Sequence, residues 1–229
     1  MKPDRRIQEI QNLSNVQSEE GRIRESALTY RKLQFLYPQE KEFYITYIQY
    51  LEEESVIAEL LWNAYEESLA CCDRAIVNLP VEDSFYFYQK KLELFILMID
   101  NDFSWYGPRK EGIQNYIREL LHNYPDNAEI LKRLMALYRV TGNHEEEQRL
   151  LDKAYQIDPN DFTLLIQKAI EYEKNENYKM SVEILEKYIK GNNPVLFYME
   201  IVYKKLIDLN TKLNNPERAA YYENLLDNL

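Results

Sequence analysis

Large apolar residues recur every three or four positions along most of the chain, and the pattern is clearest between Ala128 and Asp161. It breaks at Gly142-Asn143 and then resumes, which predicts two amphipathic helices joined by a short turn. Asp158-Pro159-Asn160 ends the second helix, because proline clashes with a continuing helix. The apolar residues on which this prediction depends are Leu131, Leu134, Tyr138, Leu150, Leu151 and Ala154. The stretch is therefore expected to form a helical hairpin.

This 34-residue stretch resembles a tetratricopeptide repeat (TPR). That pattern places large, small and aromatic residues at fixed positions and a proline at position 32. The corresponding residues here are Leu131, Leu134, Met135, Tyr138, Glu147, Leu151, Ala154 and Pro159. Met135 and Glu147 stand where the pattern prefers small residues, so local adjustment of the packing is expected in this hairpin.

Setting the terminal proline in register extends the resemblance over nearly the whole chain. It gives six repeats, Ile7–Glu40, Lys41–Glu82, Asp83–Asn127, Ala128–Asp161, Phe162–Val195 and Leu196–Leu229. The resemblance implies an all-α fold, a right-handed α-solenoid of about six helical hairpins forming one domain over residues 1–229. The scarcity of glycine and proline, 5 and 8 of 229 residues, also favours a helical protein.

The second and third repeats, with 42 and 45 residues, exceed the regular length by close to whole helical turns. Since Gln39 to Leu79 contains neither glycine nor proline, we expect lengthened helices in these repeats in place of inserted loops. The turn of the second repeat is expected either at Glu52–Ser55 or at Asn63.

In proteins of this family, the first helices of the hairpins line a concave groove that binds a partner, and the register assigns groove positions here. One end carries Glu52 and Glu53. The middle combines apolar and cationic residues, Phe87, Lys91, Leu94, Phe95, Lys132 and Arg139. The resemblance thus implies a peptide or helix of a partner protein as ligand. The alternative for Phe87, Leu94 and Phe95 is that they belong to the hydrophobic core, because aromatic residues occur on nearly every face of this repeat.

The last predicted helix carries two apolar stripes. Ala219, Tyr222, Leu226 and Leu229 form one, and Tyr221 and Leu225 form the other. We expect the first stripe to face the core. The second is a hypothetical contact for self-association or for another subunit.

The charge of the chain is −11, with 28 Lys and Arg against 39 Asp and Glu. Direct nucleic-acid binding is therefore not expected, since it depends on clustered cations that neutralise phosphates. The most apolar run, Leu94 to Ile99, is too short for membrane insertion. The N-terminal sequence lacks the apolar stretch of a secretory signal, and adjacent Cys71 and Cys72 have poor geometry for a disulfide. A cytoplasmic location is expected.

Residues that could support catalysis do not form a recognisable pattern. His122 and His144 have no metal-ligand spacing, and no glycine-rich phosphate loop occurs. Cys72 occupies a packing position of its repeat, which predicts a structural role. We therefore expect no enzyme activity, no catalytic residues, no cofactor and no bound metal.

The sequence thus predicts a non-catalytic scaffold or adaptor that acts as a subunit or assembly factor of a larger complex. Two alternatives stay open. The longer second and third repeats, with Trp62 and Tyr65, faintly resemble the half-a-TPR repeats of RNA-processing scaffolds. A cytoplasmic regulator that senses a short peptide is the other; it would need an effector domain on a separate chain.

Overall fold

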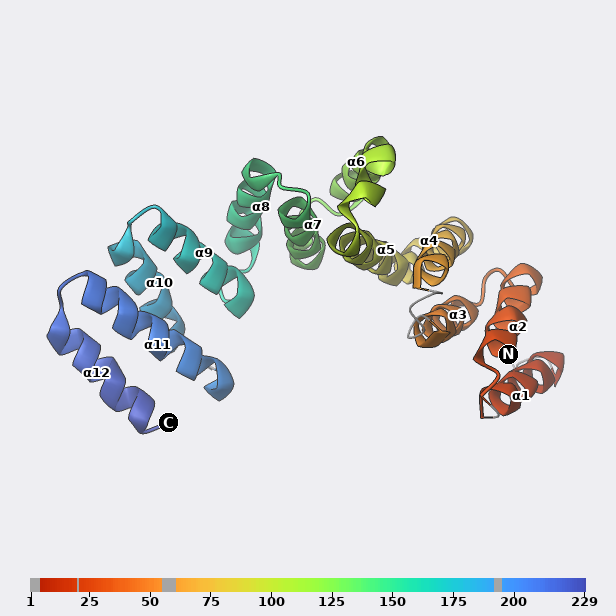
Figure 1. Ribbon diagram of the computed structural model, residues 1–229, viewed down its shortest axis with the longest axis horizontal. Helices are drawn as coiled ribbons and strands as arrows, with labels where there is room; N and C mark the ends of the chain where they lie inside the picture. Colours follow the sequence, from red (N-terminus) through yellow and green to blue (C-terminus); the bar gives the residue numbers. More distant parts are fainter. Residues whose placement is uncertain (1–4, 20, 55–60, 192–194) are drawn as a thin grey trace. The chain divides into compact units, whose positions relative to one another are not determined.

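The computed structural model describes residues 5–19, 21–54, 61–191 and 195–229, and Figure 1 shows that they are helical. These residues contain no β-strand, which confirms the predicted all-α class. Two compact units divide the chain, Met1–Asn123 and Tyr124–Leu229. We call them the N-terminal unit and the C-terminal unit and describe each by itself.

In the N-terminal unit, the described residues form six α-helices and one short 3-10 helix. These are α1 (Arg5–Glu19), α2 (Ile23–Leu36), α3 (Lys41–Glu54), α4 (Leu61–Asn78), α5 (Val81–Asn101), η1 (Phe103–Trp105) and α6 (Tyr106–Asn123). Each α-helix from α1 to α5 packs on the next one along the chain. Tyr44 on α3 meets the ring of Phe87 on α5 edge-on, with centroids 5.9 Å apart. Aromatic side chains therefore fill much of this core.

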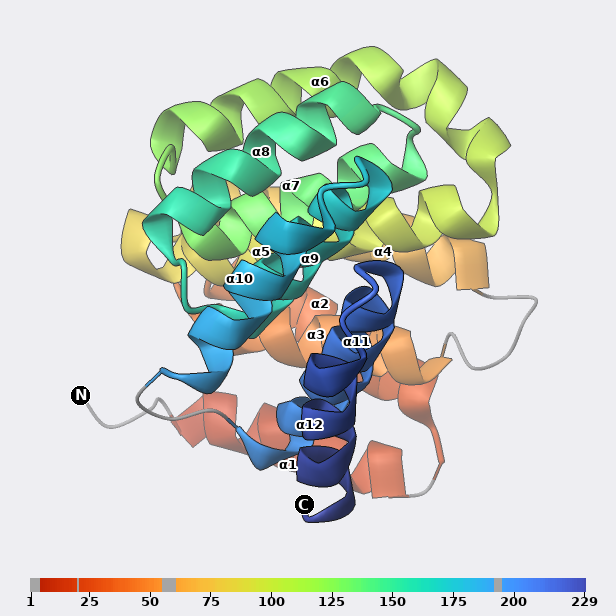
Figure 2. The ribbon, with the colours of Figure 1, turned by 90° about the vertical axis from the view of Figure 1, so that its left-hand side faces the viewer.

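The C-terminal unit consists of three antiparallel hairpins in its described residues. Their helices are α7 (Ala128–Val140), α8 (His144–Ile157), α9 (Phe162–Lys174), α10 (Tyr178–Ile189), α11 (Leu196–Lys212) and α12 (Pro216–Asp227). Within each hairpin the two helices pack together, and α8 also packs on α9 as α10 does on α11. Figures 1 and 2 show α11 and α12 side by side. This stacking of neighbouring pairs is the arrangement expected of a TPR-like solenoid.

Side chains of asparagine and aspartate fix where most helices of the C-terminal unit begin. Asn127 Oδ1 accepts a hydrogen bond from the Ile130 amide at 3.1 Å, and Asp161 Oδ1 accepts one from the Leu164 amide at 3.0 Å. Equivalent caps precede α8, α10 and α12. Such a cap satisfies an amide at the helix start that has no partner within the helix. These residues hold the helices to a regular length.

The long repeats differ from the regular ones mainly in helix length. α5 and α6 contain 21 and 18 residues, whereas α7 and α8 contain 13 and 14, so lengthened helices are confirmed in the third repeat. In the second repeat, α4 has 18 residues and α3 only 14. Residues 55–60 lie outside the described residues. Because Asn63 lies within α4, the structure excludes it as the turn of this hairpin.

Candidate partner-binding site

The three apolar residues predicted for the middle of the groove lie in the core. Phe87 and Leu94 are completely buried on α5, and Phe95 is 7% exposed. Phe95 packs edge-on against Tyr116 of α6, with ring centroids 5.6 Å apart. A partner could reach these side chains only if the hairpin came apart. The groove assignment of Phe87, Leu94 and Phe95 is therefore wrong, and the core interpretation holds.

Lys91 on α5 links three helices of the N-terminal unit. Its ammonium lies 2.5 Å from Asp73 Oδ1 on α4 and 4.4 Å from the centre of the Tyr116 ring on α6. The side chain is only 14% exposed. An ammonium held over an aromatic face gains cation–π attraction as well as its ion pair. Lys91 therefore stabilises the α4–α5–α6 packing and offers little surface to a partner.

The acidic residues predicted for one end of the groove lie in the last turn of α3. Glu52 forms an ion pair with Lys90 of α5, whose side chain is largely buried. Glu53 is exposed. Glu52 thus contributes to the packing of the N-terminal unit, and Glu53 presents its carboxylate to solvent.

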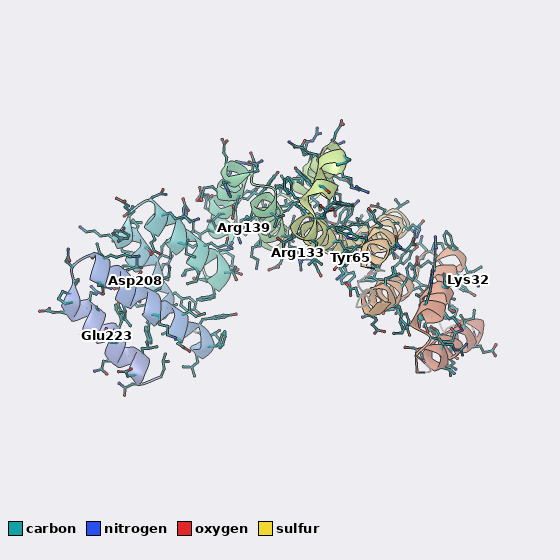
Figure 3. The ribbon with its side chains drawn as sticks, viewed as in Figure 1. Lys32, Tyr65, Arg133, Arg139, Asp208 and Glu223 are labelled. Atoms are coloured by element: carbon teal, nitrogen blue, oxygen red, sulfur yellow. The ribbon has the colours of Figure 1, made fainter. Side chains whose placement is uncertain are left out.

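Lys132 and Arg139 lie on α7, the first helix of the C-terminal unit. Lys132 pairs with Glu129 and with Asp161, whose oxygen lies 2.9 Å away, so it connects α7 to the start of α9. Burial opposes the charge on Lys132, but these two carboxylates outweigh it and raise the pKa of the ammonium. Arg139, labelled in Figure 3, is half exposed and donates from Nε to Glu147 at 2.7 Å. Arg139 is the more accessible of the two cations.

Glu147 occupies a position that is filled by serine in two other hairpins. Ser26 Oγ on α2 donates to the Ser14 carbonyl of α1, and Ser181 Oγ on α10 donates to the Ala169 carbonyl of α9, both at 2.9 Å. Both of these serines are completely buried. Glu147 instead turns its carboxylate to Arg139 and His144 at the edge of the hairpin. The expected local adjustment in α7–α8 is therefore a polar cluster at the turn.

On α12, the burial of the side chains agrees only in part with the two predicted stripes. Ala219 and Tyr222 are buried, and Leu226 packs against the core with them. Leu225 also packs partly against this core, whereas Leu229 and Tyr221 are exposed. Tyr221 is thus the member of the second stripe that is available to a partner.

Sequence reasoning missed two surface features of the C-terminal unit. Leu196 and Phe197, in the first turn of α11, are 67% and 74% exposed. Gln148 on α8 and Gln167 on α9 line one pocket and carry unpaired polar atoms. The sequence contained a signal for the first feature, because two large apolar residues directly follow the predicted repeat boundary at Val195. The second arises only when the hairpins stack.

The described residues contain neither a metal-binding cluster nor a helix that could span a membrane. They contain no cluster of three histidine, cysteine or acidic residues that could hold a metal ion. No described helix is long and apolar enough to cross a bilayer. His122 and His144 are both exposed. The chemistry of the described surface is that of charged and apolar contact groups.

Both cysteines are buried free thiols on α4. Burial raises the pKa of Cys71 to about 12 and that of Cys72 well above its usual value. At pH 8 only about one Cys71 in 10⁴ is then a thiolate, the reactive form. We expect the native protein not to react with Ellman's reagent at pH 8. The unfolded chain is expected to react with it through both thiols. Rapid reaction of one thiol in native protein would show a redox-active cysteine instead.

Comparisons with known proteins give similarity in fold only. No protein-family model matches the chain, and no curated protein matches it. Among solved structures, PilF of Pseudomonas aeruginosa aligns at a TM-score of 0.52 with 13% identity, covering 96% of this chain and 90% of its own. MamA (41-end) of Desulfovibrio magneticus RS-1 aligns at 0.52 with 13% identity over 82% and 95%. TTC0263 of Thermus thermophilus, described as a thermophilic TPR protein, aligns at 0.52 with 12% identity over 87% and 98%.

Proposed function

From the premise that the chain has a TPR-like helical-repeat fold, we propose that it is a non-catalytic scaffold that binds a partner protein. Stacked helical hairpins of this kind generally serve as protein-interaction scaffolds, because they present extended surfaces on a rigid frame. In the proposal, the chain is a subunit or assembly factor of a larger complex, and it holds a segment of its partner.

The observation that carries the proposal is an apolar surface on α11 and α12. We call it the C-terminal apolar surface and define it by four residues, Leu196, Phe197, Leu226 and Leu229. They line a hollow of about 590 Å³ together with Glu200 and Lys204. Contiguous exposed apolar side chains are unfavourable in water and mark interaction sites on soluble domains. An exposed aromatic side chain in such a surface can act as an anchor of binding energy, because it is desolvated when a partner binds.

The packing of the C-terminal unit favours a helix as the occupant of this surface. α8 packs on α9 and α10 on α11, so each of these two hairpins is covered by the first helix of the next one. α12 packs on α11 and reaches back to Glu186 of α10 through Tyr222. Among the described helices, none covers the C-terminal apolar surface. An amphipathic helix of the partner, with its apolar side on Phe197, would cover this surface.

The second part of the proposal concerns charged residues on the first helices of the hairpins. Arg139 and Lys132 on α7 are the cations through which we propose that an acidic partner segment is held in the concave groove. Glu53 would offer the opposite charge to a basic segment. Lys91 and Glu52 support the packing of the N-terminal unit, to which Glu53 belongs.

Self-association is the alternative occupant of the same end of the molecule. Tyr221 is 58% exposed on α12 and lies edge-on to Tyr222, with ring centroids 5.2 Å apart. A second copy could use Tyr221 and Leu225. Light scattering of the purified chain distinguishes self-association from binding of a different protein, since a stable dimer would double the measured mass.

Exchange of Phe197 for aspartate tests the proposal. The tagged chain is used to capture proteins from its native source, and the retained partner is identified by mass spectrometry. We expect Phe197→Asp to lower the affinity of the purified partner by at least about tenfold, because a charge replaces a buried apolar anchor. Val77→Asp, which alters an exposed apolar residue of α4, is the matched control and is expected to bind normally. Equal binding by wild type and both variants would refute the proposal.

A further inference from the structure

α2 turns one face to solvent, and this face carries both apolar and cationic side chains. We call it the α2 surface and define it by six residues, Arg24, Leu28, Arg31, Lys32, Phe35 and Leu36. Its three apolar side chains are 47% to 66% exposed. At about 100° per residue, the six residues lie within an arc of about 140° on the helix. The opposite face of α2, with Ala27, Tyr30 and Leu33, is buried in the core.

The cations of the α2 surface flank its apolar residues on both sides. Leu28 and Phe35 lie two helical turns apart and form the centre of the surface. The same helical spacing places Arg24 and Arg31 on one side of this centre and Lys32 on the other. Long cationic side chains lay their methylene groups along apolar surface and keep their charge in water. The α2 surface therefore has an apolar centre and positively charged edges.

The acidic residues next to the α2 surface are paired with cations. Glu25, which shares this face of the helix, lies 2.8 Å from Arg22, and Glu67 of α4 lies 3.5 Å from Arg31. Lys32, labelled in Figure 3, is exposed and has no ion pair among the described residues. α2 contains three cations and one carboxylate, whereas the whole chain has a charge of −11. The α2 surface is thus a basic region on an acidic chain.

We propose that the α2 surface binds the interface of a membrane that contains anionic lipids. Leu28, Phe35 and Leu36 enter the boundary between headgroups and acyl chains, and the cations at the edges contact lipid phosphates and carboxylates. Such contact needs no membrane-spanning helix. The arrangement favours a membrane over a protein partner, because exposed apolar side chains along one helix can enter a fluid interface without a complementary groove. The acidic remainder of the chain is repelled by the same membrane, which directs the α2 surface toward it.

Cosedimentation of the full chain with lipid vesicles tests the proposal. One set of vesicles contains about 70% phosphatidylcholine and about 30% phosphatidylserine, and the other contains phosphatidylcholine alone. We expect the chain to bind the anionic vesicles at least about tenfold more tightly, because each cation near an anionic surface contributes about fivefold in affinity. Equal binding to the two sets, or binding to neither, would overturn the proposal.

Lys32→Glu tests the charge of the α2 surface. We expect it to weaken binding to the anionic vesicles at least about tenfold, because an attraction is lost and a repulsion is added. Lys110→Glu, which alters an exposed lysine of α6 in the same unit, makes the same change in net charge and is expected to bind as the wild type does. Equal losses in the two variants would show that only net charge matters and would refute the assignment to α2.

Phe35→Ala tests the apolar part of the α2 surface. We expect at least about fivefold weaker binding to the anionic vesicles, because less apolar area enters the interface. Phe103→Ala is the matched control, since Phe103 is 58% exposed on η1 of the same unit. If Phe35→Ala binds as tightly as the wild type, entry of the apolar residues into the interface is refuted.

The purified protein partner distinguishes this proposal from the proposed function. Lys32→Glu and Phe35→Ala are expected to hold the partner as tightly as the wild type, and Phe197→Asp is expected to bind anionic vesicles as the wild type does. Loss of the partner in Lys32→Glu, together with a wild type that binds no vesicles, would assign the α2 surface to an acidic protein and reject the membrane. Vesicle binding that depends on Lys32 and Phe35 supports the proposal whatever Phe197→Asp does to the partner.

Discussion

Replacing Phe87 with alanine is expected to lower the free energy of unfolding by about 3–5 kcal/mol, the range measured when large aromatic side chains are removed from protein cores. Phe87 is completely buried, and its ring meets that of Tyr44 across the α3–α5 packing. Deletion would remove this contact and leave a cavity that the surrounding helices can fill only in part. The loss is measured by urea unfolding followed by circular dichroism at 222 nm.

Phe35→Ala is the matched control for Phe87→Ala. Phe35 lies on α2 of the same unit, but it is 66% exposed. Its principal contact is the Arg74 guanidinium, 6.0 Å from the centre of the ring. We expect this variant to lose less than about 1 kcal/mol, as surface substitutions generally do. Similar losses in the two variants would mean that Phe87 is not part of the core.

Replacing Ser181 with leucine is expected to lower the free energy of unfolding by about 1–3 kcal/mol through overpacking. Ser181 is completely buried where α10 lies against α9, and its hydroxyl donates to the Ala169 carbonyl. A leucine side chain would force these helices apart and would also remove the hydrogen bond. Ser181→Ala removes only the bond and should cost about 1 kcal/mol. Thermal and urea unfolding of the three proteins measure the differences.

Glu147→Leu tests the same position in the α7–α8 hairpin. Glu147 already places a long side chain there, and its carboxylate pairs with the half-exposed Arg139. Loss of such a pair is worth at most about 1 kcal/mol. We therefore expect Glu147→Leu to be clearly milder than Ser181→Leu. If the two substitutions destabilise equally, the hairpins do not differ in packing at this position.

The positions of helices were predictable because their ends carry local signals. Gly142 has a φ angle of +72°, which glycine adopts without strain, and it ends α7 within two residues of the break in the pattern. Glu176 and Asn214 take φ angles of 57° and 53° at the corresponding hairpin turns. Asparagine adopts this left-handed conformation more readily than most residues, whereas glutamate rarely does. The turns at Glu176 and Asn214 could therefore not be found by looking for glycine in the sequence.

The distinction between core and groove could not be made from the sequence of α5. Its aromatic residues lie on several faces, and a hydrophobic pattern does not state how many neighbouring helices cover a helix. In the structure, α4 packs on one side of α5. On another side, Tyr88 of α5 stacks with Tyr116 of α6, and Phe95 meets the same ring edge-on. Two covered sides bury Phe87, Leu94 and Phe95. On α7, Arg139 is half exposed, whereas Lys132 is only 22% exposed and is paired with Glu129 and Asp161.

The pocket residues escaped prediction for a different reason. Gln148 and Gln167 belong to different hairpins, and only the packing of α8 on α9 brings them to one pocket. A single glutamine carries no signal of its own, since the side chain is common on helix surfaces. Phe197 is different, because it lies in the first turn of α11 and its side chain is 74% exposed. The residues that we propose as partner contacts thus depend on tertiary arrangement more than on the repeat pattern.

Hydroxyl-radical footprinting of the chain with its purified partner tests the central claim most directly, because it measures the solvent exposure of individual side chains. The account predicts that oxidation of Phe197 falls several-fold in the complex, while oxidation of exposed Phe35 and Phe103 of the N-terminal unit is unchanged. Unchanged oxidation of Phe197 in a saturated complex would contradict the proposal that α11 and α12 hold the partner.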